Sequence, residues 1–169
     1  MKIFGKIVLK FQFLFLVTAV AVGVSSKVHA QEVVVDVTTN VLDFKAKTKA
    51  VKGSAVMKNN EVSAENIVVD LTTLKTEISM RDDHVQKHLD TKKFPEAVLL
   101  SATGKSGKGQ GRIKIRGIEK GIEGTYKTEG KMLVAEFKLN LDDFDIHDLK
   151  YMGTEVENTV VLHVSIPIK

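Results

Sequence analysis

The strongest constraint on the fold is a period of two in the hydrophobic pattern, which dominates the chain from Val33 onward. In the C-terminal segment "VVLHVSIPIK" aliphatic side chains alternate with a second, more polar set, and "VAEFKLNLDD" and "GRIKIRGI" alternate in the same way. Because successive side chains of a strand point to opposite faces, the pattern predicts strands with one buried and one wet face. The inward sets are Val160, Leu162, Val164, Ile166 and Ile168, then Ala135, Phe137, Leu139 and Leu141, then Ile113 and Ile115.

Turn signals separate these strands at short intervals. The segments "KNNE" (58–61), "GKSGKGQG" (104–111) and "KTEGK" (127–131) each lie between two strand candidates. The spacing predicts one all-β domain, an antiparallel barrel or sandwich of about eight strands between Val33 and Ile168. The glycines of 104–111 lack the order of a phosphate-binding loop, so this segment is predicted to be a mobile hairpin loop.

One segment breaks the period of two. From Ser79 to Leu89 the apolar and amphipathic side chains recur at a helical spacing, and Asp82 follows Ser79 in the manner of a helix start. Pro95 prevents a helix from continuing and favours an extended Phe94. We therefore predict a short helical insertion at about 79–90, with Ser79 as its cap.

The N-terminus has the pattern of an export signal. A lysine-bearing start leads into the apolar run "FQFLFLVTAVAVGV", and Ala30 offers a cleavage point before Gln31. We expect residues 1–30 to be a signal peptide and 31–169 to be the domain. The protein would then be periplasmic in a Gram-negative bacterium and secreted otherwise. A retained N-terminal anchor is the alternative.

The leader also accounts for the charge of the chain. Lys2, Lys6, Lys10 and Lys27 lie within it and equal the formal net charge of +4. The basic character is therefore a property of the export signal and does not indicate a nucleic-acid partner. The chain has no Cys, so its stability must come from burial and strand pairing.

Candidate chemistry is sparse. His84 and His88 would share one face of the predicted helix, the spacing of a zinc helix, but no HExxH glutamate is present. The acidic segment "LDDFDIHD" lacks the glycine and final glutamate of a calcium loop and is interpreted as a solvated strand end. No nucleophile motif or Ser-His-Asp spacing occurs, so we predict no catalytic residue, no metal ligand and no enzymatic activity. From the residues alone, the barrel interior can be either filled by side chains or open to one apolar ligand.

The segment "VDLTTLKTEISMRDDHVQKHLDTKKFPEAVLLSATG" resembles the one that marks the YceI-like family. "GRIKIRGIEKGI" is similar to the Gly-x-Leu-x-Ile-x-Gly strand and turn of that family, and "LDDFDI" with "MGTEVENTVVLHVSI" to its Asp-Phe-Gly-Ile segment and last strand. The residues that carry the first resemblance are Leu74, Thr76, Arg81, Asp82, His84, Leu89, Lys93, Phe94, Pro95, Leu99 and Ser101.

The resemblance implies an exported, lipocalin-like antiparallel barrel with a helix against it that binds isoprenoid or other long-chain amphiphilic lipids. It also implies a role for Arg81, Asp82 and His84 in seating the helix, through an Arg81–Asp82 ion pair, or in headgroup recognition. His88 needs only to pack or face water. The candidate ligand contacts are Val69, Leu71, Phe94, Ile113, Ile115, Phe137, Leu139, Phe144, Leu162 and Val164, with Phe44 as a further wall residue.

Three positions depart from the family pattern. Glu77 and Asp145 stand where glycine is usual, and Leu99 stands where many members carry Phe. These departures bear on ligand length and headgroup preference more than on the fold.

The first functional hypothesis is a non-enzymatic carrier or sequestering protein for an isoprenoid, quinone or fatty-acid derivative, with no cofactor besides the bound lipid. The alternatives are a metal-dependent enzyme or metal-binding protein using His84 and His88, and a filled-barrel adaptor in the cell envelope. A homodimer and transient contacts with membranes or envelope proteins stay open.

Overall fold

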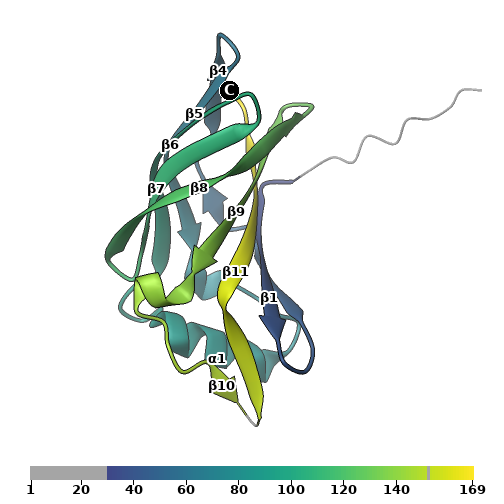
Figure 1. Cartoon of the computed structure of the whole chain (residues 1–169), viewed down its shortest axis with the longest axis vertical. Coiled ribbons are helices and arrows are strands. Elements are labelled where there is room, and N and C mark those ends of the chain that lie inside the picture. Colours follow the sequence, from purple (N-terminus) through teal and green to yellow (C-terminus); the bar gives the residue numbers. More distant parts are fainter. Residues whose placement is uncertain (1–29, 152) are drawn as a thin grey trace, which may run out of the picture.

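A computed structural model describes residues 30–151 and 153–169 (Figure 1). The predicted leader falls almost entirely outside these residues. The described part contains one α-helix, α1 (Ser79–Leu89), and two 3₁₀ helices, η1 (Leu71–Thr73) and η2 (Leu141–Phe144). Its strands are β1 (Glu32–Thr39), β2 (Phe44–Thr48), β3 (Val51–Lys52), β4 (Ala55–Lys58), β5 (Glu61–Asp70), β6 (Glu96–Lys105), β7 (Lys108–Ile115), β8 (Ile118–Glu129), β9 (Met132–Asn140), β10 (Lys150–Tyr151) and β11 (Thr154–Pro167).

The strands form one antiparallel sheet that curls into a nearly closed barrel. Its order is β2-β1-β11-β9-β8-β7-β6-β5-β3, with β10 on β11 and β4 on β5. The segment between η1 and α1 lies along the β2 edge, where Lys47 and Lys75 exchange backbone hydrogen bonds of 2.8 and 2.9 Å. The predicted antiparallel barrel is confirmed, but nine strands follow one another along the sheet rather than about eight. Strands β3 and β4 both pair with β5, and Gly53, with a φ of 119°, lies between them.

Tight two-residue turns join neighbouring strands. At 59–60, 106–107 and 116–117 both turn residues have positive φ, which matches the twist of the flanking strands. The hairpin predicted over 104–111 is confirmed, but its loop is confined to residues 106–107. Strand β6 continues to Lys105 and β7 resumes at Lys108, so most glycines of this segment lie within strands.

Two clusters of buried side chains divide the interior. We call the end with the β4–β5, β6–β7 and β8–β9 turns the upper end, and the end with α1, η1, η2 and β10 the lower end (Figure 1). The upper cluster comprises Val33, Val51, Ala55, Val62, Ala64, Ile67, Leu133 and Ile166. The lower cluster comprises Val37, Leu71, Ala97, Ile113, Ile115, Leu139, Phe144, Ile146, Val160 and Leu162.

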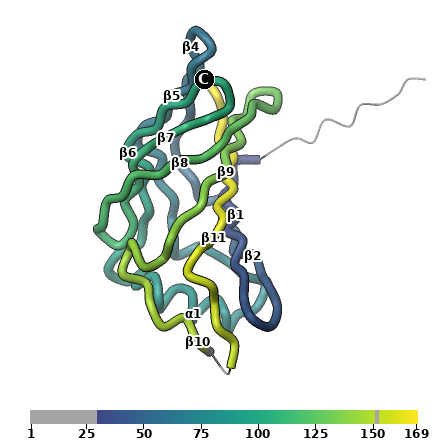
Figure 2. Tube along the Cα trace, in the orientation of Figure 1, coloured from purple at the N-terminus to yellow at the C-terminus, as the bar shows by residue number. Residues whose placement is uncertain are grey.

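Helix α1 lies across the lower end of the barrel, as the tube view shows clearly (Figure 2). Its observed span confirms the predicted helical insertion, but the predicted cap is wrong. Ser79 is the first helical residue, Ile78 occupies the cap position, and no side chain caps the N-terminus. At the other end Asp90 adopts a left-handed conformation, and its N–H donates to the carbonyls of Gln86 and Lys87. None of the described helices is long and apolar enough to cross a membrane.

Candidate functional site

A cavity of about 590 Å³ lies inside the barrel and reaches its lower end. This volume is within the roughly 300–1,000 Å³ typical of small-molecule sites. Side chains from both buried clusters line it, so it runs between them. The interior is therefore not filled by side chains. The hydrophobic pattern of the sequence could not distinguish a filled interior from an open one.

Nine of the ten predicted ligand contacts line this cavity. That they contact a ligand stays a prediction, because the structure shows only that these residues border the cavity. The nine are Val69, Leu71, Ile113, Ile115, Phe137, Leu139, Phe144, Leu162 and Val164, and the further wall residue Phe44 joins them.

Phe94 is the exception, since it is not among the residues that line the cavity. Its ring lies against the β7–β8 turn, where a Cβ added at Gly117 would come within 3.3 Å of it, and Lys93 Nζ lies 5.0 Å from the ring centroid. The half-buried ring therefore packs on the β7–β8 turn, a contact that sequence spacing cannot reveal.

A group of glycines forms the upper wall of the cavity. A Cβ on Gly104 would meet the Tyr126 ring at 2.5 Å, and one on Gly109 would meet it at 3.7 Å. The ring thus covers the space that two missing side chains leave, an arrangement that stabilises glycine in strands. The sequence interpretation missed these residues because it assigned the glycines to a loop; their alternation with Lys105, Lys108 and other polar residues was the available signal.

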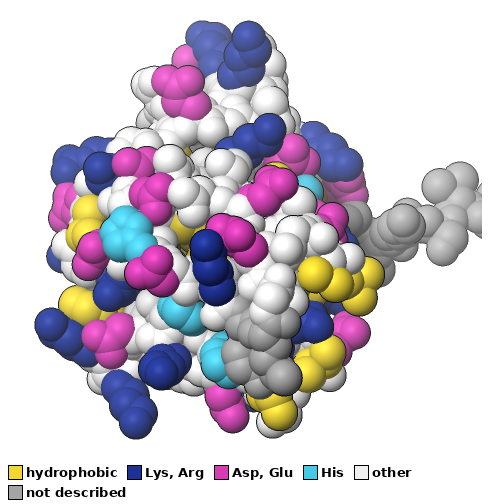
Figure 3. Space-filling model, turned by 60° about the horizontal axis from the view of Figure 1, so that its bottom comes forward, with side chains coloured by type: hydrophobic (Ala, Val, Ile, Leu, Met, Phe, Trp, Pro, Cys, Tyr) yellow, Lys and Arg dark blue, Asp and Glu magenta, His cyan; other side chains and the backbone are white. Residues whose placement is uncertain are grey.

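The lower mouth of the cavity is rimmed by exposed apolar side chains. Val41 and Leu42, between β1 and β2, are 68% and 73% exposed, and Ile78 and Met80, at the start of α1, are 49% and 59% exposed. All four line the cavity. Seen from this end, hydrophobic and histidine side chains lie among charged ones (Figure 3).

Helix α1 presents three polar side chains to the cavity. Arg81, His84 and His88 all line it and are all half-buried. The Arg81 guanidinium lies 4.3 Å from the centroid of the Phe44 ring, a cation–π geometry. His88 lines the cavity as well, a position that the sequence interpretation did not assign to it.

Asp82 fastens α1 to the barrel. Its Oδ1 accepts hydrogen bonds from Thr76 N at 2.6 Å and Thr76 Oγ1 at 2.8 Å, and its Oδ2 lies 3.3 Å from Lys75 Nζ. Burial tends to raise the pKa of this carboxyl, but the Thr76 hydrogen bonds and the Lys75 charge outweigh burial and hold the pKa below 3.8. The expected Arg81–Asp82 ion pair does not form, because the two side chains leave the helix in different directions.

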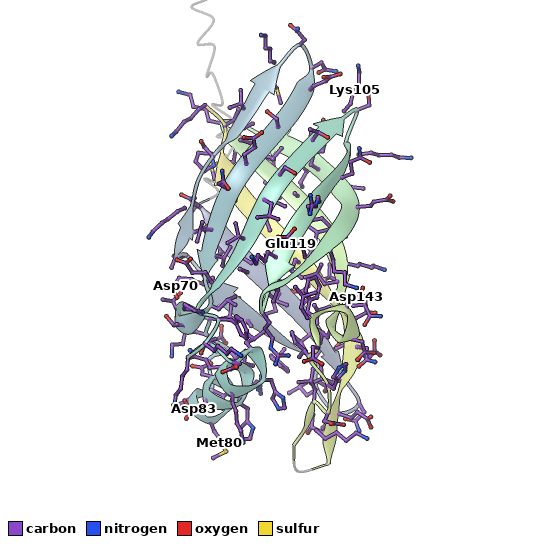
Figure 4. The ribbon with its side chains drawn as sticks, turned by 90° about the vertical axis from the view of Figure 1, so that its left-hand side faces the viewer. Asp70, Met80, Asp83, Lys105, Glu119 and Asp143 are labelled. Carbon is purple, nitrogen blue, oxygen red and sulfur yellow. The ribbon has the colours of Figure 1, made fainter. Side chains whose placement is uncertain are left out.

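The acidic segment around η2 is only partly a solvated strand end. Its carboxylates are exposed, but Phe144 is 1% exposed and Ile146 4%. Arg116 donates to the carbonyls of Phe144 and Asp145 and so joins η2 to the β7–β8 turn. This segment faces α1 across the lower end of the barrel: Figure 4 labels Met80 and Asp83 on α1 and Asp143 on η2.

His147 bridges two carboxylates of this segment. Its Nδ1 lies 2.8 Å from Asp142 Oδ1 and its Nε2 3.1 Å from Asp145 Oδ1. The hydrogen bond with Asp142, helped by the one with Asp145, holds the pKa of His147 above its ordinary value. Within residues 30–151 and 153–169, no three His, Cys, Asp or Glu side chains gather in a geometry that could hold a metal ion.

The sequence matches a known family along most of its length. Residues 20–168 match the profile of the YceI-like domain. The chain belongs to the YceI-like family. The match begins inside the predicted leader, so it does not test the boundary at residue 30.

Solved structures share this YceI-like fold at low identity. The chain is similar to Burkholderia cenocepacia BcnA, with a TM-score of 0.59 and 14% identity over 79% of this chain and 94% of that one. A polyisoprenoid binding domain from Saccharophagus degradans, implicated in plant cell wall breakdown, gives a TM-score of 0.52 and 10% identity over 81% and 97%. The Campylobacter jejuni YCEI protein gives 0.51 and 15% over 76% and 87%. No curated protein matches the chain.

The structure explains two departures from the YceI-like pattern. Glu77 and Asp145, which stand where the family usually has glycine, have φ angles of 68° and 56°. Glycine adopts this left-handed region at little cost, whereas a side chain is strained there. At both positions the chain therefore adopts a backbone geometry that favours glycine without having glycine there.

Proposed function

We propose that this protein is an exported, non-enzymatic carrier or sequestering protein that holds one long apolar or amphiphilic lipid inside its barrel. The observation that carries the proposal is the apolar cavity of about 590 Å³, which reaches the surface between α1 and the β1–β2 loop. Membership of the YceI-like family supports it, as does the similarity in fold to a polyisoprenoid binding domain. Isoprenoids, quinones and fatty-acid derivatives are the ligand classes in view.

The physical basis of such binding is burial of hydrocarbon. Each five-carbon isoprene unit that leaves water contributes roughly 3–4 kcal/mol before the cost of ordering the chain. A few units inside the barrel therefore outweigh any single polar contact at the mouth. Binding that depends mainly on hydrocarbon burial suits a protein that takes up a lipid chain and holds it away from water.

The two alternatives fare differently. A filled-barrel adaptor requires an interior without space for a ligand, which the cavity contradicts. The metal-dependent alternative gains no support from the geometry, since His84 and His88 have no third ligand beside them among the described residues.

Mass spectrometry of an organic extract of the purified protein tests the proposal. Replacing Ala135 by Trp places an indole in the cavity, because this residue lines it on β9. We expect one lipid species to accompany the wild-type protein and its amount to fall by about tenfold in the Ala135→Trp variant, a loss of about 1.4 kcal/mol in binding.

The matched control is Lys138→Trp, on the same strand but on its exposed face. It should retain the lipid. Wild-type protein that carries no lipid and takes up none from added farnesol or palmitate would refute the proposed function, as would equal lipid content in the two Trp variants with both still folded by circular dichroism.

A further inference from the structure

The cavity has an inner end near the top of the barrel, and Tyr126 lies there. This half-buried residue is the last one of β8 that lines the cavity, as Gly104 is the last one of β6. Both strands run towards the upper end, since each is followed by one of its turns. The buried side chains of Val62, Leu133 and Ile166 line the same end. A hydrocarbon chain that enters through the lower mouth therefore reaches the level of Tyr126 last.

Two glycines of neighbouring strands make room for the Tyr126 ring. Gly104 of β6 and Gly109 of β7 are cross-strand partners. A Cβ on Gly104 would lie 2.5 Å from the ring atom Cε1, and one on Gly109 would lie 3.7 Å from Cδ1. The ring belongs to β8, so it reaches across β7 to β6 and lies against a wall that carries no side chain at these two positions.

The backbone of Tyr126 is fixed in the same place. Its N–H donates to the carbonyl of Gly107, in the β6–β7 turn, with an N···O distance of 2.9 Å. The other neighbours of the ring are small: Ala135 pairs with Tyr126 across β9, and Ala102 and Gly111 line the cavity one step below. The ring is therefore the largest side chain at the inner end, and its position determines how much of that end is free.

The affinity of such a cavity for a hydrocarbon grows with each carbon that it buries. One more buried methylene group raises the affinity by roughly fourfold before the cost of ordering it. This increase ends where the chain meets the ring, because a packed wall does not yield to a further group without strain. Any additional unit then stays in water at the lower mouth and adds nothing.

We propose that Tyr126, held against Gly104 and Gly109, determines the length of the hydrocarbon chain that the barrel accepts, because the inner end of the chain stops at its ring. This inference rests on the proposed function, since it assigns a length limit to the same ligand. The ligand class is accordingly a prenyl or fatty acyl chain of limited length, and a polyprenyl chain of many units is excluded.

Competition among prenols of increasing length tests the proposal. Delipidated protein is offered equal amounts of geraniol, farnesol, geranylgeraniol, geranylfarnesol and the far longer solanesol, and mass spectrometry measures the bound fraction of each. For wild type we expect this fraction to rise with length up to one prenol and to fall beyond it, with solanesol excluded.

Removal of the ring should lengthen the accepted chain. In Tyr126→Ala the best-bound prenol should be longer by about one isoprene unit, and its ratio to the prenol that wild type prefers should change by about tenfold, because relaxation refills such a cavity only in part. Tyr126→Phe keeps the ring and should keep the wild-type profile. Thr128→Ala is the matched control, since this exposed residue follows on β8 but does not line the cavity.

A methyl group at Gly104 should have the opposite effect. In Gly104→Ala the new Cβ takes the place of the ring and moves the ring into the cavity, so the best-bound prenol should be shorter. The double variant Gly104→Ala, Tyr126→Ala carries the same change in β6 but has no ring to move. It should bind prenols as Tyr126→Ala does, which separates displacement of the ring from a general disturbance of the strand.

Fluorescence locates the chain end with the site intact, so it does not depend on the folding of a truncated variant. The chain has two tyrosines, Tyr126 and Tyr151, and no Trp, so Tyr151→Phe leaves Tyr126 as the single fluorophore. Bromine quenches a fluorophore that it contacts. A saturated fatty acid of the length that binds best should quench strongly when it is brominated at its terminal carbon and weakly when it is brominated beside its carboxylate.

The outcomes separate this inference from the proposed function. Solanesol bound as well as the shorter prenols, a Tyr126→Ala profile identical to that of wild type, or equal quenching by the two brominated acids would each overturn the role of Tyr126 and leave lipid binding intact. Circular dichroism establishes that the compared variants are folded. Failure of every prenol and fatty acid to bind wild type would refute the proposed function and this inference together.

Discussion

The two ends of the barrel are built on different principles. At the upper end two-residue turns close the strands, and small side chains with the Tyr126 ring line the cavity. At the lower end one α-helix and two 3₁₀ helices join the two-residue β7–β8 turn, and the cavity opens between exposed apolar side chains. The comparison teaches that the upper end supplies the rigid scaffold, while the lower end, made of longer connections, carries the candidate site.

Polar contacts hold the lower end together where packing is incomplete. Asp82 fixes the start of α1 to Thr76, and Arg116 holds η2 by its backbone carbonyls. These contacts are local and depend on charge, so the two ends should respond differently to core truncation and to pH.

Core truncation should produce the largest contrast. Replacing Ile67, which is 2% exposed in the upper cluster, by Ala should lower the unfolding free energy by about 2–5 kcal/mol, because a nearly fully buried side chain is lost. Phe137 borders the same cavity but is only half-buried, so Phe137→Ala should lower the unfolding free energy by only about 1–2 kcal/mol. Urea unfolding of the delipidated variants measures both losses, and equal losses would remove the distinction between the nearly fully buried upper cluster and the half-buried wall of the lower end.

The anchor of α1 should produce an intermediate effect. Asp82→Ala leaves the N–H of Thr76 without its acceptor and leaves the Thr76 hydroxyl only its 3.3 Å contact with the Ile78 carbonyl, so it should cost about 2 kcal/mol of unfolding free energy at pH 7. Because the folded-state pKa of Asp82 lies below its unfolded value, its stabilisation is present above about pH 4 and is lost as the pH falls through the lowered pKa.

The matched variant Asp82→Asn keeps an oxygen acceptor but has no group to titrate. Its stability should therefore fall less than that of wild type between pH 5 and pH 3. Identical pH profiles for wild type and Asp82→Asn, measured by urea unfolding, would show that this carboxylate does not anchor the lower end.

Backbone strain before α1 should give the smallest effect. Glu77 has a φ of 68°, and its side chain is 82% exposed with one long contact, 3.4 Å, to Lys47. Glu77→Gly should therefore raise the unfolding free energy by a few tenths to about 1 kcal/mol. Glycine relieves the backbone strain of the folded state, but it also increases the entropy of the unfolded chain, which offsets part of this gain. Glu77→Gln, which keeps the strain, should change it by less than about 0.5 kcal/mol in urea unfolding, and destabilisation by glycine would contradict this account.

Local patterns in the sequence were sufficient for the strands and the helix. The period of two in β9 and β11 predicted which side chains face inward, and the change to a helical spacing predicted α1 with its observed bounds. The same patterns failed for segment 104–111, where the glycines indicated a loop. These glycines lie in strands, and the ring of Tyr126, which is distant in the sequence, covers two of them.

The sequence by itself determined an antiparallel barrel with one helix, and its motifs indicated the family. Only the tertiary structure decided that the interior is open, that Phe94 packs on the β7–β8 turn and does not line the cavity, and that Arg81 rests on Phe44 at the mouth. The physical reason is that periodicity records which face of an element a side chain occupies. Cavity volume and cation–π contact instead depend on the distance between elements that are far apart in the chain, and no local pattern encodes that distance.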